Sequence, residues 1–222
     1  LKFEGHFHGL HDYVVWNAHG PARDTLPTYP YVPPQVESAG IPPQIADFVI
    51  VVPWNDPEAL AQAMREHGSE LAAVICEPVN YNSGCIPPRP GMLELLRQLT
   101  TQHGALLIFD EVLSSFRMAA GGAQEFYGVT PDLCTLAKAV ANGLPLAVVA
   151  GRREYMQVLS PLGPAAHSGT YSGHLFAVLA ALASLGEITQ PGFYDRIFAN
   201  ADRLYLGLTT LFDRHGVPAR VQ

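Results

Sequence analysis

The chain has 222 residues and a mass of 24.0 kDa, which is enough for one large domain with a sizeable core. Hydrophobic residues make up 48% of the sequence and charged residues 15%, a composition that excludes disorder as its main character. The 13 basic and 20 acidic residues give a net charge of -7, and no run of basic residues interrupts the sequence. We therefore expect neither a nucleic-acid partner nor binding to an anionic membrane.

Cysteine usage predicts the compartment. The three cysteines are far apart in the sequence: Cys76, Cys85 and Cys134. An odd number at wide spacing is unlike a disulfide framework, so we expect a reducing, cytoplasmic location. The two most apolar windows, 133–151 and 171–186, contain interrupting polar residues and predict no membrane span. The chain opens in a strand-like run over 1–5 with no signal sequence, and we expect a domain that starts partway through its fold.

Short apolar runs alternate with amphipathic stretches from residue 47 onward. The run 47–53 predicts a buried strand, and Asp56 followed by Pro57 predicts the start of a helix that ends near His67. A strand over 71–76, a helix over about 90–103 and a strand over 105–109 are expected next, in that order. Strands that are apolar at every position and separated by helices indicate a mostly parallel sheet. The predicted fold class is therefore α/β, with three αβα layers.

Helices dominate after residue 151. We expect one near 153–159, a long apolar one near 172–188 and an amphipathic one over 193–214. The Gln-Pro-Gly sequence at 190–192 is the best boundary, so we predict a large domain over 1–190 and, over 191–222, a helix that leads toward a second, small domain. Seven prolines between residues 20 and 45 predict a loop that lies over the site.

Two carboxylates follow predicted strands. Glu77 comes directly after the strand that ends at Cys76, and Asp110 comes directly after the strand that ends at Phe109. In parallel sheets ligands bind beyond the carboxyl ends of the strands, so both side chains are expected at one rim. Asp110 also suits a simpler role, as the N-cap of a following helix.

Lys138 is the only charged residue in the 19 residues between Asp132 and Arg152. An apolar setting lowers the pKa of a lysine and frees its amine to attack carbonyl groups, as in Schiff-base chemistry. The alternative is an ammonium group that reaches water from a strand end. A pyridoxal phosphate enzyme needs a lysine to hold the aldehyde and a carboxylate to keep the pyridine nitrogen protonated. Lys138 and Asp110 meet these two needs.

The sequence His-Ser-Gly-Thr at 167–170 precedes the long apolar helix. Small residues and hydroxyl groups near a helix start are typical of a phosphate site, and an ordinary helix cap is the alternative.

These segments together resemble class III aminotransferases of the fold type I pyridoxal phosphate family, nearest to the branch that includes glutamate-1-semialdehyde aminomutase. They occur in the family's order, and the step of 28 residues from Asp110 to Lys138 matches its spacing. The matching segments are 2–9, 77–84, 109–117, 131–138, 142–145 and 167–171.

The resemblance implies the fold of the aspartate aminotransferase-like large domain, incomplete at both ends. The family's phosphate-binding turn before residue 2 and its small carboxyl-terminal domain are not in this sequence. The resemblance also implies pyridoxal 5'-phosphate as cofactor, bound covalently to Lys138, which then acts as the catalytic base. Asp110 would pair with the pyridine nitrogen, and Asn82 would contact the ring hydroxyl.

Further site residues follow from the same resemblance. Phe7 stands where the family usually has a tyrosine stacked on the cofactor ring, and His8 lies beside it. Thr170 matches a threonine that reaches the phosphate of the neighbouring subunit's cofactor, so a homodimer with shared active sites is implied. Leu113 replaces the glutamine of simple ω-amino transaminases, which favours the aminomutase-like branch.

The implied function is an aminotransferase that moves an amino group between an amino acid or amine and a keto acid, through a Schiff base on Lys138. One alternative is an aminomutase, which returns the amine to a neighbouring carbon of the same substrate. Another is a non-catalytic remnant that serves as a binding or assembly module. Arg117 and Arg23 are candidates to bind a substrate carboxylate, and Glu77 is a weaker candidate for a substrate group.

Other chemistries have less support. The four histidines closest together have no nearby cysteine and one nearby carboxylate, Asp12, so we predict no metal site; they are His6, His8, His11 and His19. Neither a Gly-x-Ser-x-Gly elbow nor a Gly-x-Gly-x-x-Gly loop occurs, which argues against a serine hydrolase and a nicotinamide enzyme.

Overall fold

The computed structural model describes residues 1–19 and 31–221. Its helices and strands are, in chain order, β1 Lys2–Phe3, the 3-10 helix η1 Pro43–Phe48, β2 Val51–Val52, α1 Pro57–His67, β3 Ala73–Cys76, α2 Met92–His103, β4 Leu106–Glu111, α3 Gly122–Tyr127, β5 Leu133–Leu136, the 3-10 helix η2 Lys138–Val140, β6 Val148–Gly151, α4 Arg153–Met156, α5 Leu175–Ile188 and α6 Phe193–Arg214.

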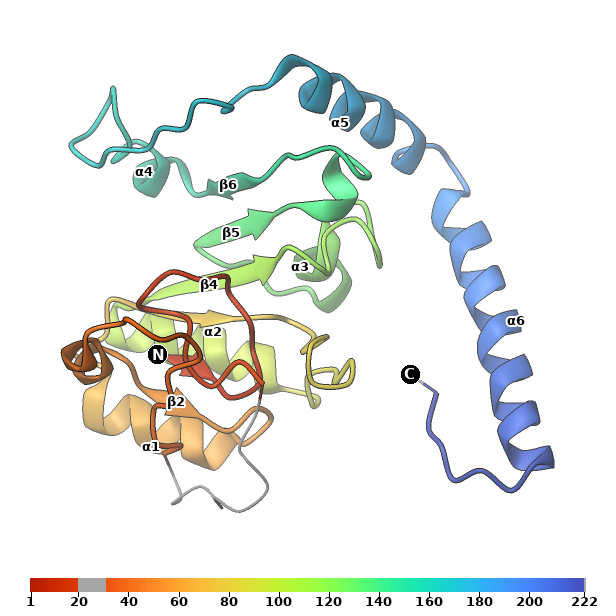
Figure 1. Ribbon diagram of the computed structural model, residues 1–222, viewed down its shortest axis with the longest axis horizontal. Helices are drawn as coiled ribbons and strands as arrows, with labels where there is room; N and C mark the ends of the chain where they lie inside the picture. Colours follow the sequence, from red (N-terminus) through yellow and green to blue (C-terminus); the bar gives the residue numbers. More distant parts are fainter. Residues whose placement is uncertain (20–30, 222) are drawn as a thin grey trace.

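Four strands form the central sheet in the order β3-β4-β5-β6. The first three are parallel, and β6 joins the edge antiparallel to β5 (Figure 1). The short strands β1 and β2 form a separate parallel pair. This pair is tied to β3, because the amino group of Leu1 donates to the carbonyl of Ala73 and the Leu1 carbonyl accepts from the N–H of Ile75. The mostly parallel sheet expected from the apolar strands is therefore present.

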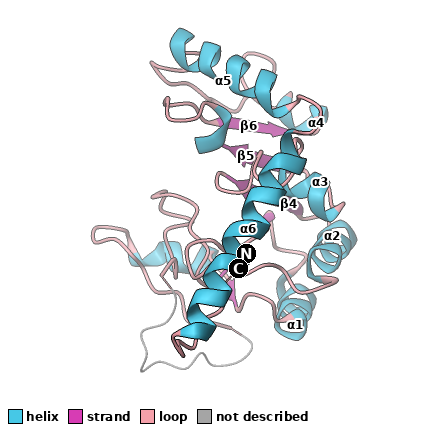
Figure 2. Ribbon diagram, turned by 90° about the vertical axis from the view of Figure 1, so that its right-hand side faces the viewer, coloured by secondary structure: helices cyan, strands magenta, loops and turns pink. Residues whose placement is uncertain are grey.

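The main core lies between the sheet and the helices α1 and α2. Figure 2 shows α1, α2 and α3 on one side of the strands and mainly loops, with one short helix, on the other. The core side chains are apolar residues from the strands and from the inner faces of these helices, among them Phe3, Leu60, Met64, Val74, Leu93, Leu96, Leu107 and Phe109. All of these are at most 2% exposed, and this packing holds the carboxyl ends of β3 and β4 in place.

Helix α1 has the bounds that the sequence predicts. The Asp56 carboxylate accepts hydrogen bonds from the N–H groups of Glu58 and Ala59, and Pro57 occupies the first turn. The strand predicted over 47–53 is shorter than expected, because η1 takes up its first residues and only Val51–Val52 pairs with β1.

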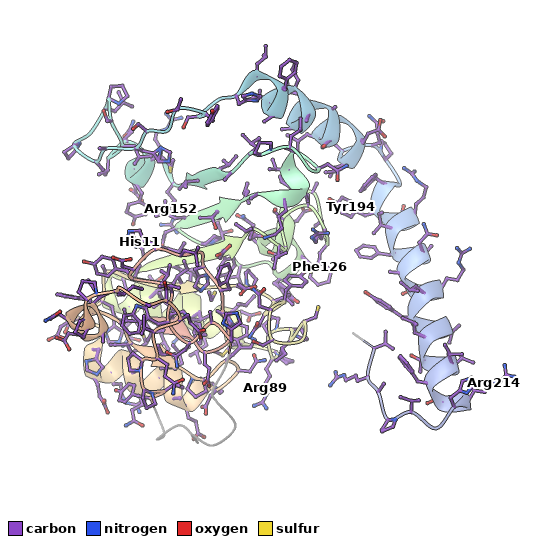
Figure 3. The ribbon with its side chains drawn as sticks, in the orientation of Figure 1. His11, Arg89, Phe126, Arg152, Tyr194 and Arg214 are labelled. Atoms are coloured by element: carbon purple, nitrogen blue, oxygen red, sulfur yellow. The ribbon has the colours of Figure 1, made fainter. Side chains whose placement is uncertain are left out.

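Helix α5 packs near η2, where Ala181 is buried against Val140 and Ala141, whereas α6, which follows it, is mostly exposed (Figure 1). The predicted break at 190–192 separates them, with Gly192 at a φ of 76°. Helix α6 has no buried residue; near its start the Tyr194 hydroxyl donates to the carbonyl of Phe116 at 3.0 Å, while Arg214 lies at its far end (Figure 3). The division into two domains at this break stays a prediction.

Among the described residues, no single helix combines the length and the apolar character needed to cross a membrane. Helices α5 and α6 meet that criterion only as a pair bent by 80°.

Candidate active site

Asp110 lies inside β4, because the strand ends at Glu111, two residues further than predicted. The ladder with β5 continues past Phe109, so that Asp110 is opposite Thr135 and Glu111 is opposite Leu136. Asp110 is 8% exposed. The N-cap alternative fails within the described chain, because the Val112 N–H does donate to the Asp110 carboxylate but the next helix begins only at Gly122.

Three donors hold the Asp110 carboxylate. Oδ1 accepts from the Val112 N–H and from the Thr135 hydroxyl, each at 3.1 Å, and Oδ2 lies 2.8 Å from Nδ1 of His8. Burial by itself would raise the pKa of Asp110, but the contact with His8 and the other two hydrogen bonds outweigh it. The pKa therefore lies below its ordinary value, and the carboxylate is ionised at neutral pH.

The His8 ring contacts the Asp110 carboxylate and orients it. Its side chain is 1% exposed, and the ionised carboxylate assigns the ring proton to Nδ1. The other nitrogen, Nε2, is buried and has no hydrogen-bond partner among the described residues. Phe7 itself is 38% exposed, so its ring stands at the surface of the rim, where it can contact a bound ring system.

Glu77 is engaged by groups of this chain. It is 3% exposed, and its carboxylate accepts from the Phe7 N–H at 2.8 Å, from the Asn82 amide at 3.1 Å and from the Tyr81 N–H at 3.4 Å. Burial raises the pKa of Glu77, and the bonds from Phe7 and Asn82 act in the opposite direction. These contacts indicate that Glu77 supports the end of its strand and the segments next to it, which disfavours contact with a substrate.

The two carboxylates share one rim, as predicted. Strands β3 and β4 are parallel neighbours with Cys76 opposite Phe109, so Glu77 and Asp110 follow paired positions. The segment that carries Phe7 and His8 joins them, because the Phe7 N–H donates to Glu77 and the His8 ring contacts Asp110. Residues far apart in the sequence thus form one hydrogen-bonded unit.

Lys138 lies just past the end of β5, at the first residue of η2. It is exposed, so its predicted burial in an apolar setting is wrong for this chain, and the alternative of an ammonium group that reaches water from a strand end is the one that the structure shows. The reason is that the uncharged stretch 133–151 is not one buried strand: it is divided among β5, η2 and the edge strand β6, and Lys138 lies past the end of β5, outside the sheet. Lys138 lines a cavity of about 540 Å³ together with Arg117, Asn142 and Pro145.

The backbone of Lys138 is unusual. Its φ is 48°, in the left-handed region that residues with a side chain rarely adopt. Backbone strain of this kind is typical of functional sites. In the sequence Lys138 follows Thr135, whose hydroxyl contacts Asp110, by three residues. Its role as the covalent attachment point stays a prediction.

Thr170 is exposed and lines a cavity of about 590 Å³ with Val112, Thr135 and His167. The predicted position of 167–170 at a helix start is wrong, because α5 begins only at Leu175 and its N-cap position is His174. A phosphate held by Thr170 would therefore gain nothing from the α5 dipole. The cavity nevertheless places Thr170 on the side of the sheet where Thr135 contacts Asp110.

The remaining candidates are less constrained. Asn82 is exposed and donates to Glu77, so its contact with a ring hydroxyl stays a prediction. Arg117 donates from Nε to the Leu113 carbonyl at 2.6 Å and lines the cavity of Lys138, which keeps it a candidate for a substrate carboxylate. Arg23 lies outside the described residues.

The four clustered histidines have separate surroundings. His8 contacts Asp110, His6 accepts from the Glu77 N–H, His19 contacts Glu37 and the ring of His11 stacks on Tyr13. No three His, Cys, Asp or Glu side chains gather as a metal site in the described part of the chain.

Sequence reasoning missed three residues of this unit. Thr135 is the hydroxyl donor to Asp110, His6 accepts from the Glu77 N–H, and Lys2 donates to the carbonyl of His6. A threonine in an otherwise apolar strand, three residues before a candidate lysine, was a usable signal. The position of Lys2 was a second signal, because the chain has only two lysines and this one lies in an apolar strand.

Comparisons with known proteins identify relatives of this chain. The chain is 44% identical over 219 residues to "Glutamate-1-semialdehyde 2,1-aminomutase 2" of Brevibacillus brevis, which covers 98% of the chain and 49% of the relative. It is 45% identical over 223 residues to the "Glutamate-1-semialdehyde 2,1-aminomutase" of Sorangium cellulosum, with 100% and 49% covered. The chain thus spans about half the length of these curated relatives.

Solved structures share the fold. An omega-transaminase from Sphaerobacter thermophilus superimposes with a TM-score of 0.89 at 33% identity, covering 100% of this chain and 50% of its own. A structure described as "Transaminase with PLP bound" gives a TM-score of 0.86 at 30% identity, with 97% and 49% covered. The predicted α/β fold class is thereby confirmed. The family model "Aminotransferase class-III" matches residues 1–222, and the chain belongs to the class III aminotransferase family.

Proposed function

We propose that this chain provides the catalytic core of a pyridoxal 5'-phosphate-dependent aminotransferase that moves an amino group between an amino acid or amine and a keto acid. The observation that carries the proposal is the rim of the sheet. A buried Asp110, held ionised by three donors, lies opposite Thr135 in β5, and Lys138 follows three residues later. This is the pair that the chemistry requires.

The residues at the rim fit the ring end of the cofactor. Each carboxylate oxygen has two lone pairs, and the three donors to Asp110 leave room for one more, such as a protonated pyridine nitrogen. The lowered pKa of Asp110 keeps it charged opposite such a cation. The half-exposed ring of Phe7 offers an aromatic face nearby.

When bound, the cofactor supplies an aldehyde that bonds to amines and a ring that accepts electrons from the substrate carbon. The residues of this chain hold and move protons around it. Asp110, oriented by His8, keeps a proton on the ring nitrogen. The Lys138 amine would hold the aldehyde and, once free, would act as the base that carries a proton from the substrate's α-carbon to the cofactor carbon bonded to the same nitrogen. Asn82 donates to the ring hydroxyl.

The test uses the fact that the chain has only two lysines, Lys2 and Lys138. The purified protein is mixed with pyridoxal 5'-phosphate, reduced with borohydride and mapped by peptide mass spectrometry. We expect the label on Lys138, because it is exposed, and not on Lys2, which is 1% exposed with its amine hydrogen-bonded. Lys138→Ala should lose both the label and the absorption band of the bound cofactor.

A label on Lys2, or a wild-type protein that stays colourless and unlabelled with excess cofactor, contradicts the proposal. The second result supports the alternative from another class, a non-catalytic module that keeps the fold for binding or assembly.

A second candidate function is an aminomutase, and the curated relatives favour it. Both carry that name at 44% and 45% identity, whereas the two transaminase structures are 30% and 33% identical. The two functions differ in their need for a second substrate. An aminomutase turns over a single amino substrate without an added keto acid, whereas an aminotransferase stops after one half-reaction.

The proposal includes a homodimer with shared active sites. Thr170 and the helix that follows it support this, because α5 exposes an apolar face. Its exposed residues are Leu175, Phe176, Leu179 and Leu182, each more than 50% exposed. Such a face is typical of a protein interface. Sedimentation equilibrium of the purified protein tests it, and a monomer at all concentrations contradicts it.

A cytoplasmic location is part of the proposal and rests on the cysteine pattern. Cys76, Cys85 and Cys134 are all unpaired in the structure. Fractionation of cells that produce the protein at its natural level tests this location.

A further inference from the structure

Lys2 carries a buried ammonium group whose role the proposed reaction does not explain. The residue lies in β1 and is 1% exposed. Its Nζ donates to the carbonyl of His6 at 2.9 Å and to the carbonyl of Trp16. A buried charge is unfavourable unless it is hydrogen-bonded, and these two carbonyls meet that need. They bracket the segment 6–16, which contains Phe7 and His8.

The electrostatic surroundings keep Lys2 protonated near neutral pH. Burial lowers the pKa of Lys2 to about 8, and the acidic residues Glu37, Glu77 and Glu4 act in the opposite direction. Glu77 contacts the first residues of the segment 6–16, through the Phe7 N–H, whereas Glu37 contacts its far end, through a backbone bond to the carbonyl of Val15.

One peptide group lies between Lys2 and Glu77. The carbonyl of His6 accepts from the Lys2 ammonium group, and the N–H of the same peptide unit, on Phe7, donates to the Glu77 carboxylate at 2.8 Å. The dipole of a peptide unit points from the carbonyl to the N–H, so both contacts are favourable and both are charge-assisted. The plane of this peptide group is therefore fixed at both of its polar ends.

This peptide group leads directly into the site. It precedes Phe7, whose ring stands at the rim, and His8, whose ring contacts Asp110 at 2.8 Å. A second bond supports the same register, because the Glu77 N–H donates to Nδ1 of His6 at 3.0 Å.

We propose that Lys2 is a positioning residue of the active site: acting with Glu77 across the peptide group between His6 and Phe7, it sets the position of the Phe7 ring and of His8, and through His8 that of the Asp110 carboxylate. Lys2 itself touches neither cofactor nor substrate. The expected effect of Lys2 on cofactor binding rests on the proposed function, but its effect on the positions of Phe7 and His8 can be tested without cofactor.

The test compares Lys2→Met, Glu77→Gln and the double variant with the wild-type chain by NMR. Lys2→Met keeps the apolar stem and removes the ammonium group. We expect the Phe7 amide proton to exchange at least about tenfold faster and the side-chain ¹⁵N signals of His8 to shift, because the peptide group loses one of its two anchors. Glu77→Gln should shift the same His8 signals.

Cofactor affinity, measured by absorbance titration, gives the second readout. Each single variant should bind pyridoxal 5'-phosphate about tenfold more weakly, as expected for one lost charge-assisted hydrogen bond. The double variant should be little weaker than either single one, because both act on the same peptide group.

Arg97→Met is the matched control. Arg97 is a cation whose side chain is 22% exposed, and it contacts Asp132, just before β5, at 2.9 Å. This variant should lower stability while leaving the Phe7 amide and the His8 signals unchanged. A purely structural role of Lys2 would make Lys2→Met behave in the same way.

The proposal is overturned if Lys2→Met leaves the Phe7 and His8 signals at their wild-type values, or if the losses of affinity in the double variant add in full. If Lys2→Met does not fold, Glu77→Gln decides alone, and unchanged His8 signals in that variant overturn it. A wild-type chain that never binds the cofactor refutes the proposed function. The NMR results still test whether Lys2 sets the positions of Phe7 and His8, because they need no cofactor.

Discussion

The two halves of the candidate site differ in how they are held. Asp110, His8 and Glu77 are buried, and each is bonded to other parts of the chain. Lys138 and Thr170 are exposed and line open cavities. The carboxylate half therefore depends on packing between β1, β3 and β4, whereas the half with the reactive amine depends on the backbone of η2 and of the segment before α5. Substitutions in the first half should lower the free energy of unfolding, and substitutions in the second half should mainly lower catalytic activity.

The largest expected effect contrasts the sheet with α6. Phe109→Ala removes a ring that is 0% exposed in β4, and we expect it to lower the free energy of unfolding by about 3–5 kcal/mol. Leu206→Ala in α6 removes a side chain that is 70% exposed, and we expect a change within about 0.5 kcal/mol. Urea titration of both variants measures the contrast, and equal losses would show that α6 is packed as tightly as the sheet.

The next effect concerns the close approach of two loops at the rim. Gly5 has a φ of 76°, and a Cβ there would lie 2.4 Å from Oγ of Ser83. Gly5→Ala should lower stability by about 1–3 kcal/mol, from backbone strain and from displacement of Ser83. Gly9→Ala is the control, because Gly9 has a similar φ of 87° with nothing within 4 Å. If both variants lose the same stability, the contact with Ser83 contributes nothing.

A smaller effect is expected at the cap of α1. Asp56→Ala removes the acceptor for two N–H groups and should lower the free energy of unfolding by about 1 kcal/mol. Asp56→Asn, which keeps an oxygen acceptor, should lose less. Thermal unfolding followed by circular dichroism measures both, and a neutral Asp56→Ala contradicts the cap.

The smallest effect is a dependence of stability on pH. The pKa of Asp110 is lower in the folded chain than in the unfolded chain, so the ionised carboxylate stabilises the fold above the unfolded pKa of about 3.9. This contribution is lost as the pH falls through the folded pKa. The stability difference between wild type and Asp110→Asn should therefore shrink as the pH is lowered from about 5 to about 3.

The pKa of Glu77 is raised on folding, so its contribution has the opposite sign. The difference between wild type and Glu77→Gln should grow in favour of wild type as the pH falls, because the folded chain takes up the proton more readily. Denaturant titrations at several pH values measure both differences, and parallel curves for the two variants would contradict the opposite pKa shifts.

Local rules in the sequence were enough for several elements. The bounds of α1 follow from Asp56 and Pro57, and those of α6 from its amphipathic pattern after Gly192. The sequence also predicted that Glu77 and Asp110 share a rim, because parallel strands end on the same side. These features depend on neighbouring residues and on a general property of parallel sheets, so a single sequence carries them.

Contacts between distant segments could not be predicted in this way. The bond between His8 and Asp110 joins residues 102 positions apart, and the bond between Phe7 and Glu77 joins residues 70 positions apart. The sequence left open whether Lys138 is buried or reaches water, because an apolar stretch does not show where its strand ends, and the structure places Lys138 past the end of β5. Amino-acid order determined which groups this protein has and where its helices begin. Only the tertiary structure decided which groups meet, because burial and pairing depend on what the rest of the chain places beside each residue.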